Sequence, residues 1–206
     1  MSFTFLQQVF GIIAGLLALI SAVPYVKSIL KRETIPHRTT YGLWTLLYII
    51  SLTSYIAAGA RFTAFFIGAY LLVQLVIFAL SFKYGTGGLE KLDILCTLGA
   101  LVGIILWLIT KSPLYALYLT IAAELFAFAP TIIKTYKKPY SESLSAWIIG
   151  ACGGMFNIFA IDKLQPEIYI YPIFIFVLEF SLVILMLTRR PKLENHLKQE
   201  SDSYKN

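Results

Sequence analysis

Two glutamates, Glu124 and Glu179, lie near the middle of long apolar stretches of the sequence. A charged side chain at the centre of a bilayer costs about 2.5–3.5 kcal/mol even on the most lenient scale, so each residue needs a physical reason. No Lys or Arg lies at a similar depth to neutralise either one. We expect both to carry a proton for much of the time, because desolvation disfavours the charged form. Carboxyl groups of this kind are typical of proton sites and of anchors for cationic or hydroxyl-bearing ligands.

The two glutamates differ when the two halves of the sequence are aligned with each other. Glu179 corresponds to Gln74, and a hydrogen-bonding residue repeated at one position is readily explained by a contact between helices. Glu124 corresponds to Ala18, so only the second half carries this carboxyl group. We therefore expect Glu124 to have a functional role, as a proton site or a ligand anchor. We interpret Glu179 first as a residue that forms hydrogen bonds between helices.

Other polar residues are candidates for the same region. Asn157 and Ser54 occupy equivalent positions in the two halves, and Tyr55 is adjacent to Ser54. These residues either line the outer half of a cavity or form interhelical hydrogen bonds, and the sequence leaves both interpretations open. No HExxH or GxSxG pattern, paired histidines or metal-like cysteine spacing occurs. We expect no enzyme, metal or cofactor.

The composition places the chain in a lipid bilayer. It has 206 residues, of which 58% are hydrophobic and 14% charged, and its mean hydropathy is +0.76. A helix needs about 20 apolar residues to span the hydrocarbon core. The net charge of +6 is spread over loops and the C-terminal segment, which does not indicate nucleic-acid binding. The predicted spans are 4–29, 41–60, 62–83, 91–110, 113–135, 144–161 and 168–188.

The basic residues predict the orientation of these seven spans. Three of the 17 Lys and Arg residues fall on one face, whereas 14 fall on the face that carries the C-terminus. Because short cytoplasmic loops retain Lys and Arg during insertion, we expect the N-terminus outside and the C-terminus in the cytoplasm of a plasma or inner membrane.

A proline-centred pattern occurs twice on the basic face. Pro24 and Pro130 are each followed by six residues and a basic pair. A second proline, Pro36 or Pro139, then follows, and seven residues separate it from Trp44 or Trp147. A repeated pattern on one face indicates a duplicated unit in parallel orientation, which requires an additional span between the copies. We predict two three-helix repeats, 4–84 and 113–188, joined by a linker helix at 91–110 and followed by a disordered tail at 189–206.

The segments "VPYVKSILKRETIPHRTTYGLW" and "APTIIKTYKKPYSESLSAW" resemble the PQ-loop/SWEET superfamily over about 180 residues. Tyr25 and Thr131 stand where the family has a glutamine after the proline, and Gly150 stands where some members carry an aspartate. The resemblance implies a small-molecule transporter that holds its substrate between two triple-helix bundles, with proton coupling left open. The alternative is a seven-helix receptor or sorting protein of the same architecture. Because one chain contains two repeats, it does not need to dimerise to form a transporter. The sequence does not exclude a homo-oligomer.

The repeated prolines and tryptophans have two interpretations each. Pro24 and Pro130 loosen the ends of symmetry-related helices, either as hinges or as the exit of the chain into the loop. Trp44 and Trp147 serve either as a shared gate or as interfacial anchors.

The charge distribution predicts the accessibility of two loops. A cysteine introduced at Lys163 should react with an impermeant thiol reagent added to intact cells, because 14 of the 17 basic residues are expected on the opposite face. A cysteine at Lys137 should react only after permeabilisation. The reverse result would contradict the predicted orientation.

Overall fold

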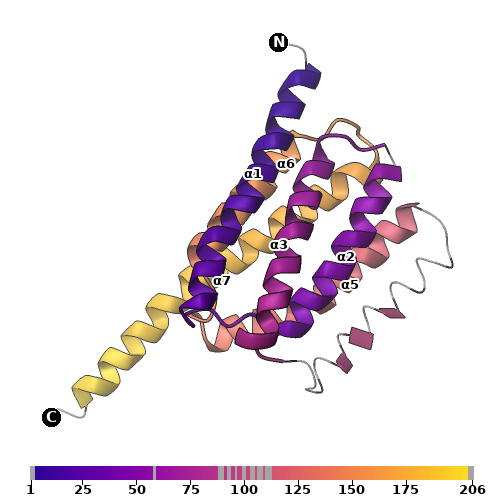
Figure 1. Ribbon diagram of the computed structural model, residues 1–206. Coiled ribbons are helices and arrows are strands. Elements are labelled where there is room, and N and C mark those ends of the chain that lie inside the picture. The colour runs from indigo at the N-terminus through magenta and orange to yellow at the C-terminus, as the bar shows by residue number, and fades with distance from the viewer. Residues whose placement is uncertain are drawn as a thin grey trace.

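The computed structural model describes residues 3–57, 59–87, 91, 94–95, 97–98, 101–102, 105, 109 and 113–203. The predicted linker helix at 91–110 lies outside the described residues apart from those few positions. The described chain is all-helical apart from its loops (Figure 1). Its helices are α1 (Phe3–Leu30), α2 (Arg38–Ala57), α3 (Thr63–Tyr84), α5 (Pro113–Lys137), α6 (Leu144–Phe159) and α7 (Pro166–Ser203).

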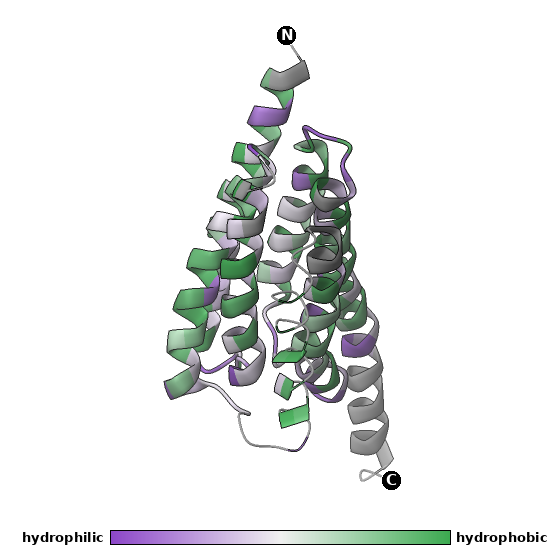
Figure 2. Ribbon diagram, turned by 90° about the vertical axis from the view of Figure 1, so that its right-hand side faces the viewer, coloured by the Kyte–Doolittle hydropathy of each residue, from purple (hydrophilic) through white to green (hydrophobic). Residues whose placement is uncertain are grey.

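Three helices in the described part of the chain are long and apolar enough to cross a membrane. These segments are Phe5–Leu30 in α1, Thr63–Tyr84, which is α3, and Ile168–Pro191 in α7. The shorter helix α6 is also apolar. The hydropathy colouring shows apolar residues along the outer faces of the helices (Figure 2). The protein is therefore an all-α membrane protein.

Large apolar side chains lie on the outer surface of the helix bundle, and several polar side chains lie in its interior. Leu16, Leu72 and Val177 each expose more than half of their side-chain surface. In contrast, Glu124 and Asn157 are almost completely buried. A soluble domain of this size would hide the leucines and expose the carboxyl group. The reversed distribution is the one that a lipid solvent selects.

The helices pack in a closed ring. Helix α1 contacts α3 and α6, helix α2 contacts α3 and α5, and helix α7 contacts α5 and α6. Following the contacts around the bundle gives the order α1, α3, α2, α5, α7, α6 and back to α1. Exchanging α1, α2 and α3 with α5, α6 and α7 leaves this order of contacts unchanged. The packing thus has the pattern of a two-fold pseudo-symmetry.

The loops that join equivalent helices meet at the same end of the bundle. The loop between α1 and α2 donates a hydrogen bond from the Ile35 amide to the Ser141 carbonyl in the loop between α5 and α6 (3.2 Å). At the opposite end, the Lys163 ammonium group before α7 donates to the Gly59 carbonyl before α3 (3.1 Å). Equivalent helices therefore run in the same direction.

Both repeated prolines lie inside helices. Helix α1 continues past Pro24 to Leu30, and helix α5 continues past Pro130 to Lys137. Each proline removes one helical hydrogen bond without ending its helix. Both helices therefore carry a local weak point at the same end of the bundle.

The C-terminal segment differs from the disorder predicted from residue 189 onward. Helix α7 extends through Pro191 to Ser203. The segment is rich in Lys, Leu, Glu and Gln, which have high helix propensity even where they bury little surface. Composition alone therefore did not indicate that helix α7 continues beyond Pro191.

Small residues in α6 allow close packing, as the "ACGG" segment predicts. A Cβ atom built on Gly153 would lie 3.3 Å from the Ala14 carbonyl oxygen of α1. One built on Gly154 would lie 3.2 Å from the Phe176 Cα atom of α7. The short segment thus brings α6 close to both neighbours.

Two glycines in matched helical settings provide a test of the packing. A Cβ atom at Gly11 would lie 2.6 Å from the Phe62 carbonyl oxygen, whereas one at Gly68 would have only Leu52 within 4.0 Å. We expect Gly11→Ala to lower the free energy of unfolding by about 1–3 kcal/mol through overpacking. Gly68→Ala should be neutral or raise it by up to about 1 kcal/mol, because Ala has the higher helix propensity. Unfolding of purified protein in detergent measures both effects, and equal effects would contradict the packing.

Candidate functional site

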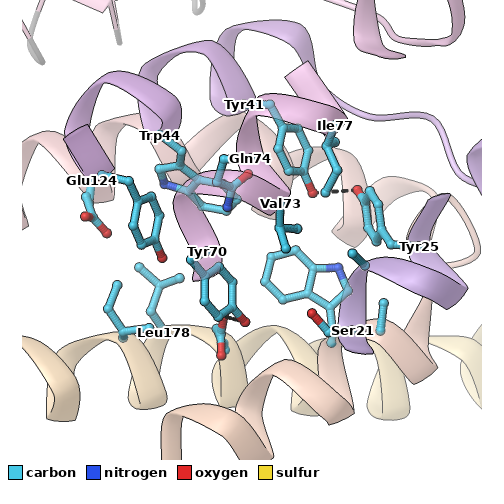
Figure 3. Close-up of a pocket in the computed structure, with 16 residues that line it drawn as sticks. Ser21, Tyr25, Tyr41, Trp44, Tyr70, Val73, Gln74, Ile77, Glu124 and Leu178 are labelled. Carbon is cyan, nitrogen blue, oxygen red and sulfur yellow. Dashed lines mark hydrogen bonds between the residues drawn. The ribbon is translucent and has the colours of Figure 1, made fainter. Parts of the chain in front are cut away.

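A small cavity lies in the middle of the helix ring (Figure 3). Its volume is about 40 Å³, which is enough for a small number of water molecules. Every described helix contributes to its wall, and all lining residues except the half-buried Ala22 are buried. The lining residues are Ser21, Ala22, Tyr25, Tyr41, Trp44, Tyr48, Tyr70, Val73, Gln74, Ile77, Glu124, Ala146, Trp147, Ile175, Leu178 and Glu179.

Two carboxyl groups approach this cavity from different helices. Glu124 of α5 and Glu179 of α7 are 1% and 4% exposed. The hydroxyl group of Tyr171 donates a hydrogen bond to Oε1 of Glu124, and that of Tyr70 donates to Oε1 of Glu179. Each glutamate is thus held by one tyrosine through one oxygen, which fixes its orientation toward the cavity.

Glycines of α6 make room for Glu179. A Cβ atom at Gly150 would lie 2.6 Å from the Tyr70 hydroxyl oxygen and 3.4 Å from Oε2 of Glu179. A Cβ atom at Gly154 would lie 3.5 Å from the same Oε2 atom. A larger residue at position 150 would therefore displace the tyrosine–glutamate pair.

Several buried polar atoms in the cavity wall have no hydrogen-bond partner in the described part of the structure. They are Oε2 of Glu179, Oε1 of Gln74 and Nε1 of Trp44. Gln74 and Trp44 both line the cavity and are labelled in Figure 3. Buried polar groups are almost always satisfied by protein or water, since leaving one unpaired costs about 1–3 kcal/mol. The three unpaired atoms are therefore available for hydrogen bonds to water or to a polar molecule in the cavity.

Aromatic rings form much of the wall. Trp44 stacks on Phe128 with ring centroids 5.5 Å apart and packs edge-on against Trp147 at 6.2 Å. Deeper in the bundle, the rings of Tyr48 and Tyr70 are stacked at 5.6 Å. The tryptophans from the two halves of the chain thus meet across the pseudo-symmetry axis, instead of standing at the outer surface as interfacial anchors do.

Glu142 organises the end of the bundle that carries the basic loops. Its carboxylate is 0% exposed and forms an ion pair with Lys134, whose side chain is 13% exposed. Tyr25 of α1 and Trp147 of α6 donate to Oε2 of Glu142 at 2.6 and 3.0 Å. Tyr41 of α2 donates to the Tyr25 hydroxyl group at 2.6 Å, as Figure 3 shows. One carboxylate therefore connects α1, α2, α5 and α6.

Arg190 of α7 attaches the loop that carries Glu142. Its guanidinium group donates to the Glu142 carbonyl oxygen at 2.8 Å and to the Pro139 carbonyl oxygen at 3.0 Å. Glu142 also lies just before the first turn of α6, where the partial positive charge of the helix favours an anion. The loop, its carboxylate and α7 thus form one connected unit.

The residues that follow the two repeated prolines have equivalent roles with different side chains. Tyr25 follows Pro24 and bonds to Glu142 just before α6. Thr131 follows Pro130 and donates to the Thr40 hydroxyl group at the start of α2 (3.2 Å). Each proline therefore precedes a residue that joins one half of the chain to the other.

Tyrosines also join the two halves of the chain away from the Glu142 network. Tyr55 donates from its hydroxyl group to the Ile168 carbonyl oxygen at 3.1 Å, and its ring lies edge-on to Tyr171 at 5.8 Å. Ser51 lies 3.4 Å from the Tyr171 hydroxyl group. These contacts join α2 to α7, so they are also bonds between the two halves.

The structure gathers half of the ten predicted site residues around the cavity. Glu124, Glu179, Gln74, Trp44 and Trp147 line it. The two glutamates have the same kind of tyrosine partner. The geometry therefore gives no reason to assign a functional role to Glu124 and only a structural one to Glu179.

The other predicted site residues lie outside the cavity wall. Tyr55 contributes to the tyrosine contacts between α2 and α7, and Asn157 is fully buried with both side-chain polar atoms unpaired. Pro24 and Pro130 are in α1 and α5 but do not contact the cavity. The side chain of Ser54 falls outside the described part of the structure.

Sequence reasoning missed Glu142, Tyr48 and Tyr70. Glu142 lies within the repeated segment, five residues before Trp147, where the first copy has Thr39 before Trp44. An acidic residue at one copy of a repeated position was a usable signal. The tyrosines carried none, because tyrosine is common throughout this chain.

No protein-family model, curated protein or solved structure matches this chain.

The Glu142 network predicts a strong effect on stability. Glu142→Ala should lower the free energy of unfolding by about 3–5 kcal/mol, because Lys134 loses its partner in a buried ion pair. Tyr25 and Trp147 also lose their acceptor. Denaturant unfolding in detergent measures the change, with Glu33→Ala at an exposed position as the control. Equal stability of the two variants would contradict a structural role for this network.

Proposed function

We propose that the protein is a small-molecule transporter that works by alternating access. In this proposal seven spans form two parallel three-helix repeats joined by the segment 91–110. The ring of helix contacts, which is unchanged by exchange of the two halves, supports the repeats. The meeting of equivalent loops at one end supports their parallel orientation. The N-terminus lies outside and the C-terminus in the cytoplasm of a plasma or inner membrane, as the basic residues favour.

One observation carries the functional proposal. A cavity with buried and unpaired polar atoms lies between the two halves, and bonds toward both ends of the bundle join these halves. At the basic end these bonds are Tyr25–Glu142 and Thr131–Thr40. At the other end the bond is Tyr55–Ile168. A rocking motion of the halves opens one set while the other stays closed, which is the requirement of alternating access.

The weak points in α1 and α5 suit such a motion. Pro24 and Pro130 precede the residues that form the bonds at the basic end. A helix that lacks one backbone hydrogen bond there bends at lower cost. We therefore assign the two prolines as hinges and Trp44 with Trp147 as part of the closure at that end. Opening toward the cytoplasm then separates Tyr25 from Glu142.

The chemistry of the wall favours a transporter over a receptor for a peptide carboxylate. Recognition of a carboxylate uses Arg or Lys side chains. None of the described residues that line the cavity is Arg, Lys or His, whereas two are glutamates. Lys134 is already paired with Glu142. The proposed substrate is a small polar metabolite that is not anionic.

Uptake by purified protein in liposomes tests the proposal. We expect the wild type to accumulate at least one solute from a panel of amines, amino acids and sugars. Glu124→Gln should reduce this uptake by roughly tenfold or more, because hydrogen bonds to charged groups contribute about 1.5–3 kcal/mol. The amide still accepts a hydrogen bond from Tyr171, so the variant should remain folded.

Two comparisons make the uptake result interpretable. Glu33→Gln removes one carboxyl group at an exposed position and should transport as well as the wild type. Measuring uptake with and without a pH gradient separates proton coupling from substrate binding at Glu124. Absence of uptake for every solute, in a protein that remains folded, would refute the transporter.

A further inference from the structure

We propose that the central cavity binds a small organic cation that carries an ammonium group and a neighbouring oxygen acceptor. This inference rests on the proposed transporter function and names the class of its substrate. It follows from the hydrogen-bonding groups, the charge and the aromatic surface of the cavity wall, which are independent properties.

The unpaired atoms of the wall specify the polarity of the ligand. Oε2 of Glu179 and Oε1 of Gln74 accept hydrogen bonds, whereas Nε1 of Trp44 donates one. All three residues are 4% exposed. The complementary ligand offers at least two donors and one acceptor. An ammonium group supplies up to three donors from a single atom, and a hydroxyl or carbonyl oxygen supplies the acceptor.

The charge of the wall selects a cation over a neutral polyol. Glu124 and Glu179 both line the cavity, and the described lining contains no basic side chain. Each carboxyl group has one oxygen occupied by a tyrosine hydroxyl group. A tyrosine hydroxyl stabilises a carboxylate but does not neutralise it. Burial disfavours the ionised form of these carboxyl groups, and a bound ammonium ion would stabilise the ionised form of Glu179 by pairing with its open oxygen.

The aromatic surface supports the same class of ligand. Trp44, Trp147, Tyr48 and Tyr70 all line the cavity. The faces of Trp and Tyr rings attract cations through their quadrupoles, and aromatic cages are a recurrent way to bind ammonium groups. A sugar would stack on one such ring but would require more polar partners than the wall presents.

The size of the cavity restricts the ligand further. Its volume of about 40 Å³ admits only a few non-hydrogen atoms without movement of the wall. A two-carbon amino alcohol matches this size, whereas a disaccharide does not. A zwitterionic amino acid would bring its own carboxylate, a negative charge, close to the two glutamates.

Binding of three small probes to purified full-length protein tests the inference. Ethanolamine carries both features, ethylene glycol lacks the ammonium group, and ethylamine lacks the oxygen. At fixed pH and ionic strength, calorimetry should give ethanolamine an affinity roughly tenfold or more above that of ethylene glycol, because the ammonium group bonds to a carboxylate. Ethylamine should be intermediate.

Three variants locate the site. Glu179→Gln should weaken ethanolamine binding by roughly tenfold or more and leave ethylene glycol unchanged, while Glu33→Gln should change neither. Trp44→Phe removes the donor but keeps an aromatic ring that stacks on Phe128. It should abolish the difference between ethanolamine and ethylamine without reducing the affinity for ethylamine. Thermal unfolding of each variant shows whether it remains folded.

The outcomes separate this inference from the proposed function. Equal affinity for ethanolamine and ethylene glycol, or binding of neutral solutes alone, would overturn the cation site even if liposomes transport a solute. Ethanolamine binding that Glu179→Gln weakens, in a protein that transports nothing, would support the site and refute the transporter. Ethanolamine binding that is insensitive to Glu179→Gln and Trp44→Phe would place the ligand elsewhere and overturn the inference.

Discussion

Carboxyl groups within apolar helices must be shielded from lipid, and the arrangement of the helix bundle follows from this constraint. An unpaired charged or polar group facing hydrocarbon costs several kcal/mol. Glu124 and Glu179 are therefore turned to the centre of the ring, and each receives a hydrogen bond from a tyrosine of another helix. The outer faces carry exposed Leu, Val and Phe side chains. The polar interior and the apolar exterior have the same physical cause.

The two halves of the chain are more alike in how their helices pack than in the side chains at equivalent positions. Equivalent helices have equivalent neighbours, and the residue after each repeated proline joins the two halves. On one side this residue is Tyr25, which contacts a buried ion pair, while on the other it is Thr131, which contacts another threonine. The contact of Tyr25 with the Glu142 carboxylate is stronger than the contact between the two threonines. The two equivalent contacts at the basic end therefore differ in strength.

Contacts between side chains surround the small cavity toward both ends of the bundle. The aromatic cluster around Trp44 and the Glu142 network lie toward the basic end, and Tyr55 with Tyr171 lies toward the other. Each end includes contacts that cross between the two halves, such as Tyr25–Glu142 at the basic end and Tyr55–Ile168 at the other. Another bond between the halves, Tyr70–Glu179, lies at the cavity itself. In the proposed motion these contacts change, whereas the backbone hydrogen bonds of the helices stay intact.

The sequence alone determined the environment of the chain, the approximate helix positions and the repeated proline segments, because hydropathy and local spacing are properties of adjacent residues. It also indicated Glu124, Glu179, Gln74, Trp44 and Trp147, since polar residues and repeated aromatics stand out in an apolar chain. It did not reveal that Tyr70 and Tyr171 hold the glutamates or that Glu142 joins four helices. It also predicted disorder where α7 continues. These features depend on which helix faces are brought together across large separations in the chain, and only the tertiary packing decides that.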